Sequence, residues 1–238
     1  MTSLPNYIFD VDGTLTPSRG KMAQEFQNFF EHFATHNACY LVTGSDREKT
    51  LEQIPYSLYA LCIKVFQQSG NDVWEQNRRV GKYSWDVPGS LINYLKEKLD
   101  QSKFPIKTGI HAEHRGGMVN FSVVGRECNL DERAMYKKWD GKHEERKKIA
   151  AGVMDKFNGL TAQVAGETGI DIFEAGKDKS QIVKWIDTPA IFYGDKMQPG
   201  GNDYPLAVEL RRLPGCECIE VNNWKDTLRG LQERENNL

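Results

Sequence analysis

Two aspartates that directly follow a short apolar segment constrain this chain more than any other feature. Residues 7–16 read YIFDVDGTLT, so Asp10 and Asp12 lie one residue apart at the end of the apolar run. Side chains two positions apart in a strand point to the same side, which places both carboxylates at the strand's carboxyl end. Two carboxylates that close raise each other's proton affinity unless a cation or a phosphoryl group lies between them. One can then act as nucleophile or metal ligand and the other as proton donor and acceptor. An ordinary turn or a calcium site is the alternative interpretation.

The composition is that of an ordinary globular protein. Charged residues make up 27% and apolar residues 39% of 238 residues, and the formal net charge is −2. This length suffices for one core, or for a core with a smaller inserted domain. The charge balance favours neither nucleic acid nor an anionic membrane as a partner. The sequence shows neither a membrane-spanning run nor a signal-peptide pattern, so we expect a cytoplasmic protein.

The cysteines and histidines give little sign of cross-linking or metal binding. The five cysteines are scattered and odd in number, which argues against a disulfide framework. Cys216 and Cys218 form a single close pair without the further ligands that a zinc site needs. We therefore expect structural or surface roles for these residues.

The first 82 residues alternate between strand-like and helix-like segments. Apolar residues at helical spacing predict a helix over residues 21–36, and strands are predicted at 39–43 and 63–66. Ser45, with Glu48 three residues later, predicts a capping box that opens a helix ending near residue 53. This order predicts an α/β protein with a parallel, doubly wound sheet that binds ligands at the carboxyl ends of its strands.

From about residue 83 the pattern changes to that of an α+β insertion. A helix at 91–99, short alternating segments at 109–114 and 118–124, helical runs after Asn129, and strands at 160–164 and 170–173 are predicted. Buried-strand character returns at 190–195 and 218–221. We therefore predict a core of residues 1–82 and 177–238, interrupted by an inserted domain of residues 83–176.

Polar residues suited to phosphoryl chemistry follow the predicted core strands. Thr43 ends one strand, and Ser45 follows at the start of a helix, where backbone N–H groups favour a phosphoryl oxygen. A simple cap is the alternative role for Ser45. Lys179 lies at the return to the core, where a lysine can neutralise an aspartyl-phosphate, although most lysines are solvated.

A glycine-rich acidic loop follows the strand predicted at 190–195. It reads GDKMQPGGND over residues 194–203, and its Asp195 and Asp203 suit Mg²⁺, which prefers carboxylate oxygens. A turn rich in Asp and Asn would have a similar composition. Its position after a core strand favours the metal site.

These motifs resemble a known family. The DVDGT run resembles the first motif of the haloacid dehalogenase superfamily, and the whole chain resembles the eukaryotic-type phosphomannomutases, a branch with an inserted cap domain. The matching segments are FDVDGTLT at 9–16, GSD at 44–46 with Glu48, RGGMVNFSVVGR at 115–126, DIF at 171–173, Lys179, GDK at 194–196 and PGGND at 199–203.

The resemblance implies an activity and assigns roles to the core residues. It implies that mannose 6-phosphate and mannose 1-phosphate interconvert through a hexose 1,6-bisphosphate, which supplies mannose 1-phosphate for GDP-mannose synthesis. Asp10 would be the phosphorylated nucleophile and Asp12 the general acid and base, while Thr43, Ser45 and Lys179 would assist. The implied cofactors are Mg²⁺, held by Asp10, Asp12, Asp195 and Asp203, and a catalytic hexose 1,6-bisphosphate.

The cap would hold the far end of the substrate. Arg115, Arg126 and Arg133 correspond by motif to a group that binds the distal phosphate, because guanidinium forks bind phosphate in a bidentate manner. The resemblance also implies Arg19, Asp171 and Asn120 as substrate-binding residues; for Asn120 a plain strand residue is the alternative. Hexose phosphates and a second copy of the chain, bound through the cap, are the implied partners. Closure of the cap is expected to exclude water.

The sequence also departs from the family pattern. Gly169 stands where the family usually has a serine, and Thr43-Gly44 where it often has two glycines. Glu209 is only a rough counterpart of the family's acidic loop, which argues against a second cation site. A sugar-phosphate phosphatase built on the same core and a non-catalytic binding module are the alternatives to a mutase.

Overall fold

The chain divides into two compact units, which we describe one at a time. The computed structural model describes residues 4–236. The first unit contains the described residues up to Lys82, Asp178–Pro199, and the described residues from Asp203 onward. The second unit contains Tyr83–Lys177, and the short segment Gly200–Asn202 is assigned to it.

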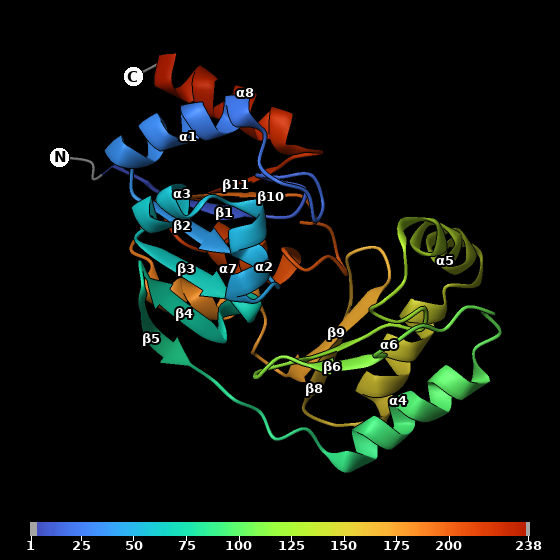
Figure 1. Cartoon of the computed structure of the whole chain (residues 1–238). Coiled ribbons are helices and arrows are strands. Elements are labelled where there is room, and N and C mark those ends of the chain that lie inside the picture. The colour runs from blue at the N-terminus through green and yellow to red at the C-terminus, as the bar shows by residue number, and fades with distance from the viewer. Residues whose placement is uncertain (1–3, 237–238) are drawn as a thin grey trace. The chain divides into compact units, whose positions relative to one another are not determined.

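The first unit contains a seven-stranded sheet in the order β11-β10-β1-β2-β3-β4-β5 (Figure 1). The strands β11, β10, β1, β2 and β3 run parallel, and β4 and β5 complete the sheet as antiparallel strands. The parallel core sheet predicted from the sequence is thus confirmed, whereas the antiparallel strands were not predicted. The strands are β1 (Asn6–Asp10), β2 (Cys39–Val42), β3 (Lys64–Gln67), β4 (Asp72–Glu75), β5 (Arg78–Lys82), β10 (Ala190–Gly194) and β11 (Glu217–Glu220).

The register of the central strands aligns their carboxyl ends. Asp10, the last residue of β1, is paired with Val42 at the end of β2. On the other side of β1, Phe9 is paired with Tyr193 of β10. The residues that leave these three strands therefore emerge at the same edge of the sheet, where parallel sheets bind their ligands.

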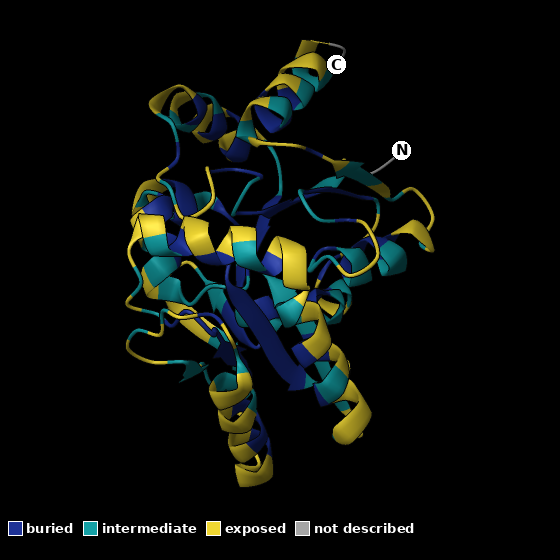
Figure 2. Cartoon of the chain, turned by 90° about the vertical axis from the view of Figure 1, so that its right-hand side faces the viewer, coloured by how far each residue is buried: buried dark blue, intermediate teal, exposed yellow. Residues whose placement is uncertain are grey.

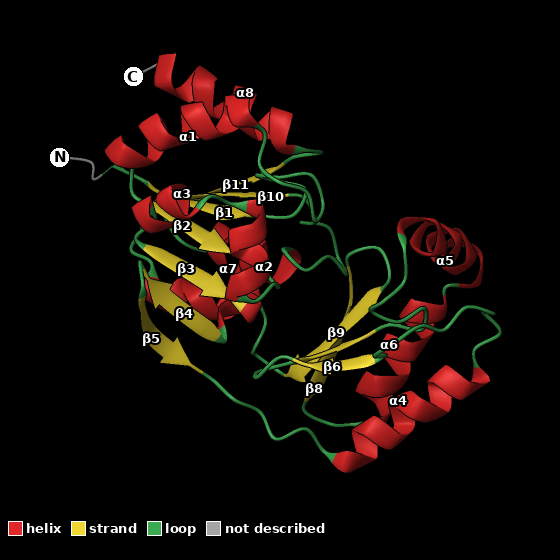
Figure 3. Ribbon diagram, in the orientation of Figure 1, coloured by secondary structure: helices red, strands yellow, loops and turns green. Residues whose placement is uncertain are grey.

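Helices cover both faces of this sheet. One apolar core joins the β1 residues Tyr7 and Phe9 to α1, α3 and α8, and a second joins Ile8 to α7 and the 3₁₀ helix η2. Figure 3 shows helices on both sides of the central strands. In Figure 2 the helix at the C-terminus, α8, carries exposed and buried residues on different faces. These elements are α1 (Gln24–His36), α2 (Arg47–Gln53), α3 (Tyr56–Leu61), α7 (Tyr204–Arg211), α8 (Trp224–Asn236), and the 3₁₀ helices η1 (Gln68–Gly70) and η2 (Lys179–Trp185).

One predicted cap in this unit is wrong. Ser45 and Glu48 do not form the expected capping box, because the N-cap of α2 is Asp46, whose side chain accepts a hydrogen bond from the Lys49 N–H. Aspartate is as good an N-cap as serine, so the sequence leaves a choice between neighbouring residues. The helix does end at Gln53, as predicted.

The second unit is an antiparallel sheet with three helices. Its strand order is β6-β7-β9-β8, and its core contains Leu91 of α4, Tyr136 of α5 and Val153 of α6. The helical run predicted after Asn129 is confirmed as α5, which Asn129 and Glu132 open with a reciprocal capping box. The elements are α4 (Gly89–Gln101), β6 (Ala112–His114), β7 (Val119–Phe121), α5 (Leu130–His143), α6 (Glu145–Lys156), β8 (Leu160–Ala165) and β9 (Gly169–Glu174). Across residues 4–236, the helices fall short of the length and apolar character that crossing a membrane requires.

Candidate active site

A buried lysine joins two aspartates at the carboxyl edge of the first unit's sheet. Lys179 Nζ lies 2.5 Å from Asp10 Oδ1 and 2.7 Å from Asp203 Oδ1. The exposed fractions of Asp10, Lys179 and Asp203 are 3%, 1% and 0%. Buried charges are stable only when they are paired, so these three side chains depend on one another.

Burial and neighbouring charges shift the proton affinities of this group. Burial raises the pKa of Asp10 to about 8, with Lys179 opposing the shift and Asp203 and Asp195 adding to it. Burial disfavours the charge on Lys179, but Asp10 and Asp203 outweigh that effect and raise the pKa of this ammonium above its usual value. A lysine that keeps its charge in this surrounding can stabilise negative charge arriving at Asp10.

Three carboxylates at this edge have the arrangement of a cation site. One oxygen from each of Asp10, Asp195 and Asp203 lies within 4.8 Å of the others, and we call these residues the carboxylate cluster. Asp195 Oδ1 is buried and has no hydrogen-bond partner among the described residues. A buried carboxylate oxygen without a donor is suited to a hard cation such as Mg²⁺. The cluster therefore fits the metal that the sequence predicts.

Backbone groups and a glycine fix the shape of this cluster. Asp203 Oδ2 accepts hydrogen bonds from the N–H groups of Asp195 and Lys196, both at 3.1 Å. Gly13 has φ +87°, and a Cβ atom there would lie 2.5 Å from Asp195 Oδ2. The glycine of the DVDGT run is thus required both by the turn and by the close approach of Asp195.

Asp12 lies beside the carboxylate cluster but is held by other partners. Its Oδ1 accepts a hydrogen bond from the Arg19 N–H at 2.6 Å and another from Gln53 Nε2 at 3.0 Å. Its carboxylate is outside the carboxylate cluster, so its predicted role as a metal ligand stays a prediction. Arg19 itself is exposed and contributes its backbone, with a positive φ of 57°, to this loop.

Thr43 and Ser45 follow β2 at the same edge of the sheet. Thr43 is 1% exposed, and its hydroxyl accepts a hydrogen bond from the Ser45 N–H at 3.1 Å. Because β2 pairs with β1 up to Asp10, Thr43 leaves the sheet next to the strand that carries the nucleophile candidate. Ser45 does not cap α2 and is half-buried in the loop before that helix.

The predicted arginines of the second unit form ion pairs with two glutamates, Glu113 and Glu167. Glu113 Oε2 accepts hydrogen bonds from Arg115 Nε at 2.9 Å and Nη2 at 2.5 Å, and it lies 2.9 Å from Arg126 Nε. Arg133 Nη2 lies 3.6 Å from Glu167 Oε2. We call Arg115, Arg126 and Arg133 the arginine cluster.

The arginine cluster is dense in positive charge. Burial and the charge of Arg115 lower the pKa of Arg126, Arg133 adds to that effect, and Glu113 and Asp171 oppose it. The arginine side chains are 9% to 15% exposed. Partly desolvated guanidinium groups that repel one another favour a bound dianion such as a phosphate.

A polar row crosses the sheet beside these arginines. The strand register pairs Glu113 with Asn120 and Asn120 with Asp171, and Gln163 of β8 with Asp171. Asn120 Nδ2 donates to Asp171 Oδ1 at 2.6 Å, and Asn120 Oδ1 accepts from Arg126 Nη1 at 3.2 Å. Asn120 therefore connects Arg126 of the arginine cluster to Asp171, and its role in substrate binding stays a prediction.

Gly169 leaves room for this asparagine. A Cβ atom at Gly169 would lie 2.7 Å from Asn120 Nδ2. The departure from the family's serine at this position is thus coupled to the position of the Asn120 amide. Glu209, the rough counterpart of a second cation site, forms an ion pair with Arg212 at 2.6 Å.

Sequence reasoning missed two residues that contact the predicted ones. Glu113 lies two residues before Arg115, and strand periodicity would have placed both on one face of the sheet. Gln53 gave no comparable signal, because its contact with Asp12 spans 41 residues of sequence.

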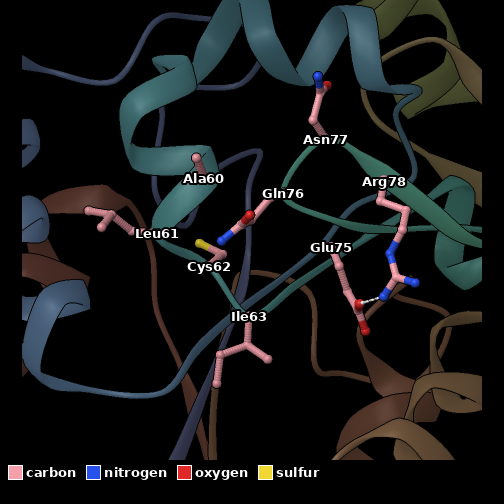
Figure 4. Close-up of a pocket in the computed structure, with 8 residues that line it drawn as sticks. All are labelled: Ala60, Leu61, Cys62, Ile63, Glu75, Gln76, Asn77 and Arg78. Atoms are coloured by element: carbon pink, nitrogen blue, oxygen red, sulfur yellow. Dashed lines mark hydrogen bonds and ion pairs between the residues drawn. The ribbon is translucent and has the colours of Figure 1, made fainter.

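A separate pocket lies on the first unit, between the end of α3 and the turn joining β4 to β5 (Figure 4). Its volume is about 730 Å³, and its wall includes the ion pair between Glu75 and Arg78, with 2.6 Å between Oε2 and Nη2. Its lining residues are distinct from the carboxylate cluster. Nothing in its lining resembles a catalytic arrangement of the kind that surrounds Asp10.

Two known structures illustrate the fold that this chain shares with other proteins. A haloacid dehalogenase-like hydrolase from Bacteroides thetaiotaomicron aligns with 86% of this chain and 85% of its own, at a TM-score of 0.54 and 12% identity. An IMP-nucleotidase from Plasmodium falciparum aligns with 94% of this chain and 66% of its own, at a TM-score of 0.61 and 14% identity. Identities this low establish the fold alone, which is a haloacid dehalogenase-like fold.

Proteins with similar sequences identify the family of this chain, and not only its fold. A phosphomannomutase from Drosophila melanogaster is 32% identical over 95% of this chain and 93% of its own length. The Saccharomyces cerevisiae phosphomannomutase is 28% identical over 87% of this chain and 86% of its own. The sequence model described as "Eukaryotic phosphomannomutase" matches residues 26–235. The chain therefore belongs to the eukaryotic phosphomannomutase family.

Proposed function

We propose that the protein interconverts mannose 6-phosphate and mannose 1-phosphate through a phosphorylated Asp10 and a hexose 1,6-bisphosphate. The observation that carries the proposal is the buried contact between Lys179 and Asp10, at 2.5 Å, within the carboxylate cluster of a phosphomannomutase family member. The proposal also divides the chain into a core of residues 1–82 and 177–238 and a cap of residues 83–176.

Asp10 is the proposed nucleophile. Its Oδ1 faces Lys179, and its Oδ2 accepts a 3.3 Å hydrogen bond from the Thr14 hydroxyl. A carboxylate oxygen attacks phosphorus, a bond forms between Asp10 and the phosphoryl group, and the bond from phosphorus to the sugar oxygen breaks. Asp12 gives a proton to the departing sugar oxygen, and in the reverse half it takes a proton from the accepting hydroxyl.

The surrounding groups offset the charge of the phosphoryl group. Lys179 keeps its proton and faces the oxygens that gain charge, while Thr43 and Ser45 supply a hydroxyl and backbone donors at the next strand end. Asp10, Asp195 and Asp203, with the Asp12 backbone, would hold Mg²⁺. When bound, this cation would neutralise charge on the phosphoryl oxygens.

The second unit is the proposed site for the other end of the substrate. The arginine cluster would bind the phosphate that is not being transferred, with Arg19 as a further substrate arginine. Asp171 and Asn120 would receive the sugar hydroxyls. A mutase needs such a site, because its bisphosphate intermediate has two dianionic ends and each must be held in turn.

The decisive experiment separates transfer to sugar from transfer to water. The protein is mixed with mannose 1-phosphate, Mg²⁺ and catalytic glucose 1,6-bisphosphate, and mannose 6-phosphate and free phosphate are both measured. Mannose 6-phosphate as the main product, and its loss in Asp10→Asn, are expected. Free phosphate as the main product would instead identify a sugar-phosphate phosphatase, and activity retained by Asp10→Asn would refute the mechanism.

Two further parts of the proposal concern the protein in the cell. We propose a cytoplasmic homodimer that associates through the second unit and supplies mannose 1-phosphate for GDP-mannose synthesis. Light scattering on the full chain and on a variant with charged substitutions at exposed positions of the second unit tests the dimer. A monomer at micromolar concentration would refute it.

A further inference from the structure

Gln53 connects the end of α2 to the loop that follows β1. It is 6% exposed, and its Nε2 lies 3.0 Å from Asp12 Oδ1. Its backbone carbonyl accepts a hydrogen bond from the Met22 N–H at 2.9 Å. Both the side chain and the backbone of one residue thus bind the loop that contains Asp12.

The neighbours of Gln53 fix the orientation of its amide. Besides Asp12 Oδ1, its Nε2 lies 3.2 Å from Thr16 Oγ1 and 3.4 Å from the Gly20 carbonyl oxygen. The Thr16 hydroxyl donates its proton to the Val11 carbonyl at 3.2 Å, so it presents a lone pair to Gln53. All three neighbours are acceptors, which requires the NH₂ group to face them. Asp12 is the nearest of the three and the only anion among them, so it receives the strongest of these bonds.

The two oxygens of Asp12 are therefore unequal. Oδ1 accepts from Gln53 and from the Arg19 N–H, at 3.0 and 2.6 Å. Within residues 4–236, both of these donors reach Oδ1, and Oδ2 receives no hydrogen bond. Two donors occupy the lone pairs of Oδ1, which leaves Oδ2 as the oxygen able to carry a transferable proton.

We infer that Gln53 is a positioning residue for proton transfer, which holds the Asp12 carboxylate so that Oδ2 gives and takes the proton of the sugar oxygen. This inference rests on the proposed role of Asp12 as general acid and base. Gln53 does not touch the reacting atoms in this arrangement. Its effect must therefore be specific to steps in which the leaving group needs a proton.

The test compares two leaving groups in the first turnover. An alkoxide that leaves from a hexose phosphate needs protonation, whereas p-nitrophenolate leaves from p-nitrophenyl phosphate without it. Rapid-mixing measurements follow the release of sugar and of p-nitrophenolate from Gln53→Met, which keeps the side-chain length and removes the donor. We expect sugar release to slow by roughly tenfold to a hundredfold, as for the loss of part of an acid–base contribution. The p-nitrophenolate burst should change by less than about twofold by the same argument.

A matched control lies one turn earlier in the same helix. Thr50 is fully buried, and its hydroxyl donates to Gln67 Oε1 at 2.8 Å, away from Asp12. Thr50→Val removes a buried polar group of α2 and should leave the ratio of the two rates unchanged. Gln53→Glu provides a second variant of the same shape, because an ionised carboxylate cannot donate to Asp12. It should show the same selective loss if Gln53→Met does not fold.

The outcomes separate this inference from the proposed function. Asp12→Asn should reduce sugar release selectively and by more than either Gln53 variant. If it does so while a folded Gln53 variant slows both leaving groups equally or neither, the positioning role is wrong and the role of Asp12 stands. If Asp12→Asn leaves the ratio unchanged, both are wrong.

Discussion

Lys179 contacts Asp10 at 2.5 Å although 169 residues separate them in the sequence. The same ammonium lies 2.7 Å from Asp203, so one lysine balances two buried carboxylates. The contact joins the first strand of the chain to the segment that follows the second unit. The stability of the first unit and the proposed phosphoryl chemistry therefore depend on the same charge.

Lys179→Met should abolish phosphoryl transfer and destabilise the metal-free protein. Removing one partner of a buried ion pair leaves an uncompensated charge, which costs roughly 3–5 kcal/mol. Urea unfolding in a chelator measures the loss. Lys184→Met is the matched control, because Lys184 is exposed on the same 3₁₀ helix η2 and should change stability by less than about 0.5 kcal/mol. Equal stability of the two variants would contradict this prediction.

Asp10 should make the metal-free protein less stable as the pH rises. The pKa of Asp10 is raised from 3.8 to about 8 in the folded protein, mainly by burial, so the folded state binds this proton more tightly than the unfolded state. Its stabilising contribution is complete below about pH 4 and is lost as the pH rises through about 8. Thermal melting between pH 5 and 8, in a chelator, should show a decline that Asp10→Asn reduces. A decline of the same steepness in Asp10→Asn would assign it to other groups.

The same pKa predicts that a cation displaces a proton from the site. Because its pKa is raised, metal-free Asp10 keeps its proton to a higher pH than an ordinary aspartate, whereas a metal-bound carboxylate is ionised. Binding of Mg²⁺ should therefore release a proton and tighten as the pH rises from about 6 to 8. Calorimetric titrations in two buffers with different ionisation enthalpies count the released protons. Identical heats in both buffers would show that Asp10 is already ionised.

Gly13→Ala should disrupt the cation site directly. The added Cβ atom would lie 2.5 Å from Asp195 Oδ2, and the residue must also keep a φ of +87°. The left-handed backbone alone costs about 1–2 kcal/mol in an L-residue, and displacement of Asp195 should weaken Mg²⁺ binding in addition. Gly176→Ala separates the two effects, because Gly176 has φ +80° with no atom within 4 Å of the added Cβ. Only Gly13→Ala should lose Mg²⁺ affinity.

Gly169→Ser should damage the proposed sugar recognition. Its Cβ atom would displace the Asn120 amide, which lies 2.7 Å away and is bonded to Asp171 at 2.6 Å. Loss of such a buried hydrogen bond to a charged group costs about 1.5–3 kcal/mol, so we expect a higher KM for hexose phosphates. The p-nitrophenyl phosphate reaction should be unchanged. Gly141→Ser, in open space on α5, is the control for an added serine in the second unit.

The sequence predicted the elements whose signal is local. The strands β1, β2 and β10 are continuous apolar runs, because both faces of the sheet are covered by helices. Because the ends of β1 and β10 could be predicted, the aspartates at those ends could also be placed at the edge of the sheet. The hairpin of β4 and β5 was missed because β5 is largely exposed and carries charged residues rather than an apolar run.

The features that were not predicted correctly depend on contacts between residues distant in the sequence or on small differences in backbone conformation. Ser45 and Asp46 are both good N-caps, and in the structure Asp46, with an extended backbone at ψ 174°, caps the helix. The contact of Gln53 with Asp12 could not be predicted, because nothing in the sequence around a glutamine at a helix end indicates which distant carboxylate it contacts.

The pairing of β1 with β10 has a consequence for how this architecture can diversify. Every residue of the carboxylate cluster, together with Lys179, is encoded outside residues 83–177, on strands and loops that bond to one another within the first unit. The intervening segment can therefore be lengthened, replaced or exchanged over evolutionary time while the chemical step is inherited unchanged. If the proposed function holds, recognition of the sugar by the second unit can change in evolution without a change in the phosphoryl chemistry of the first.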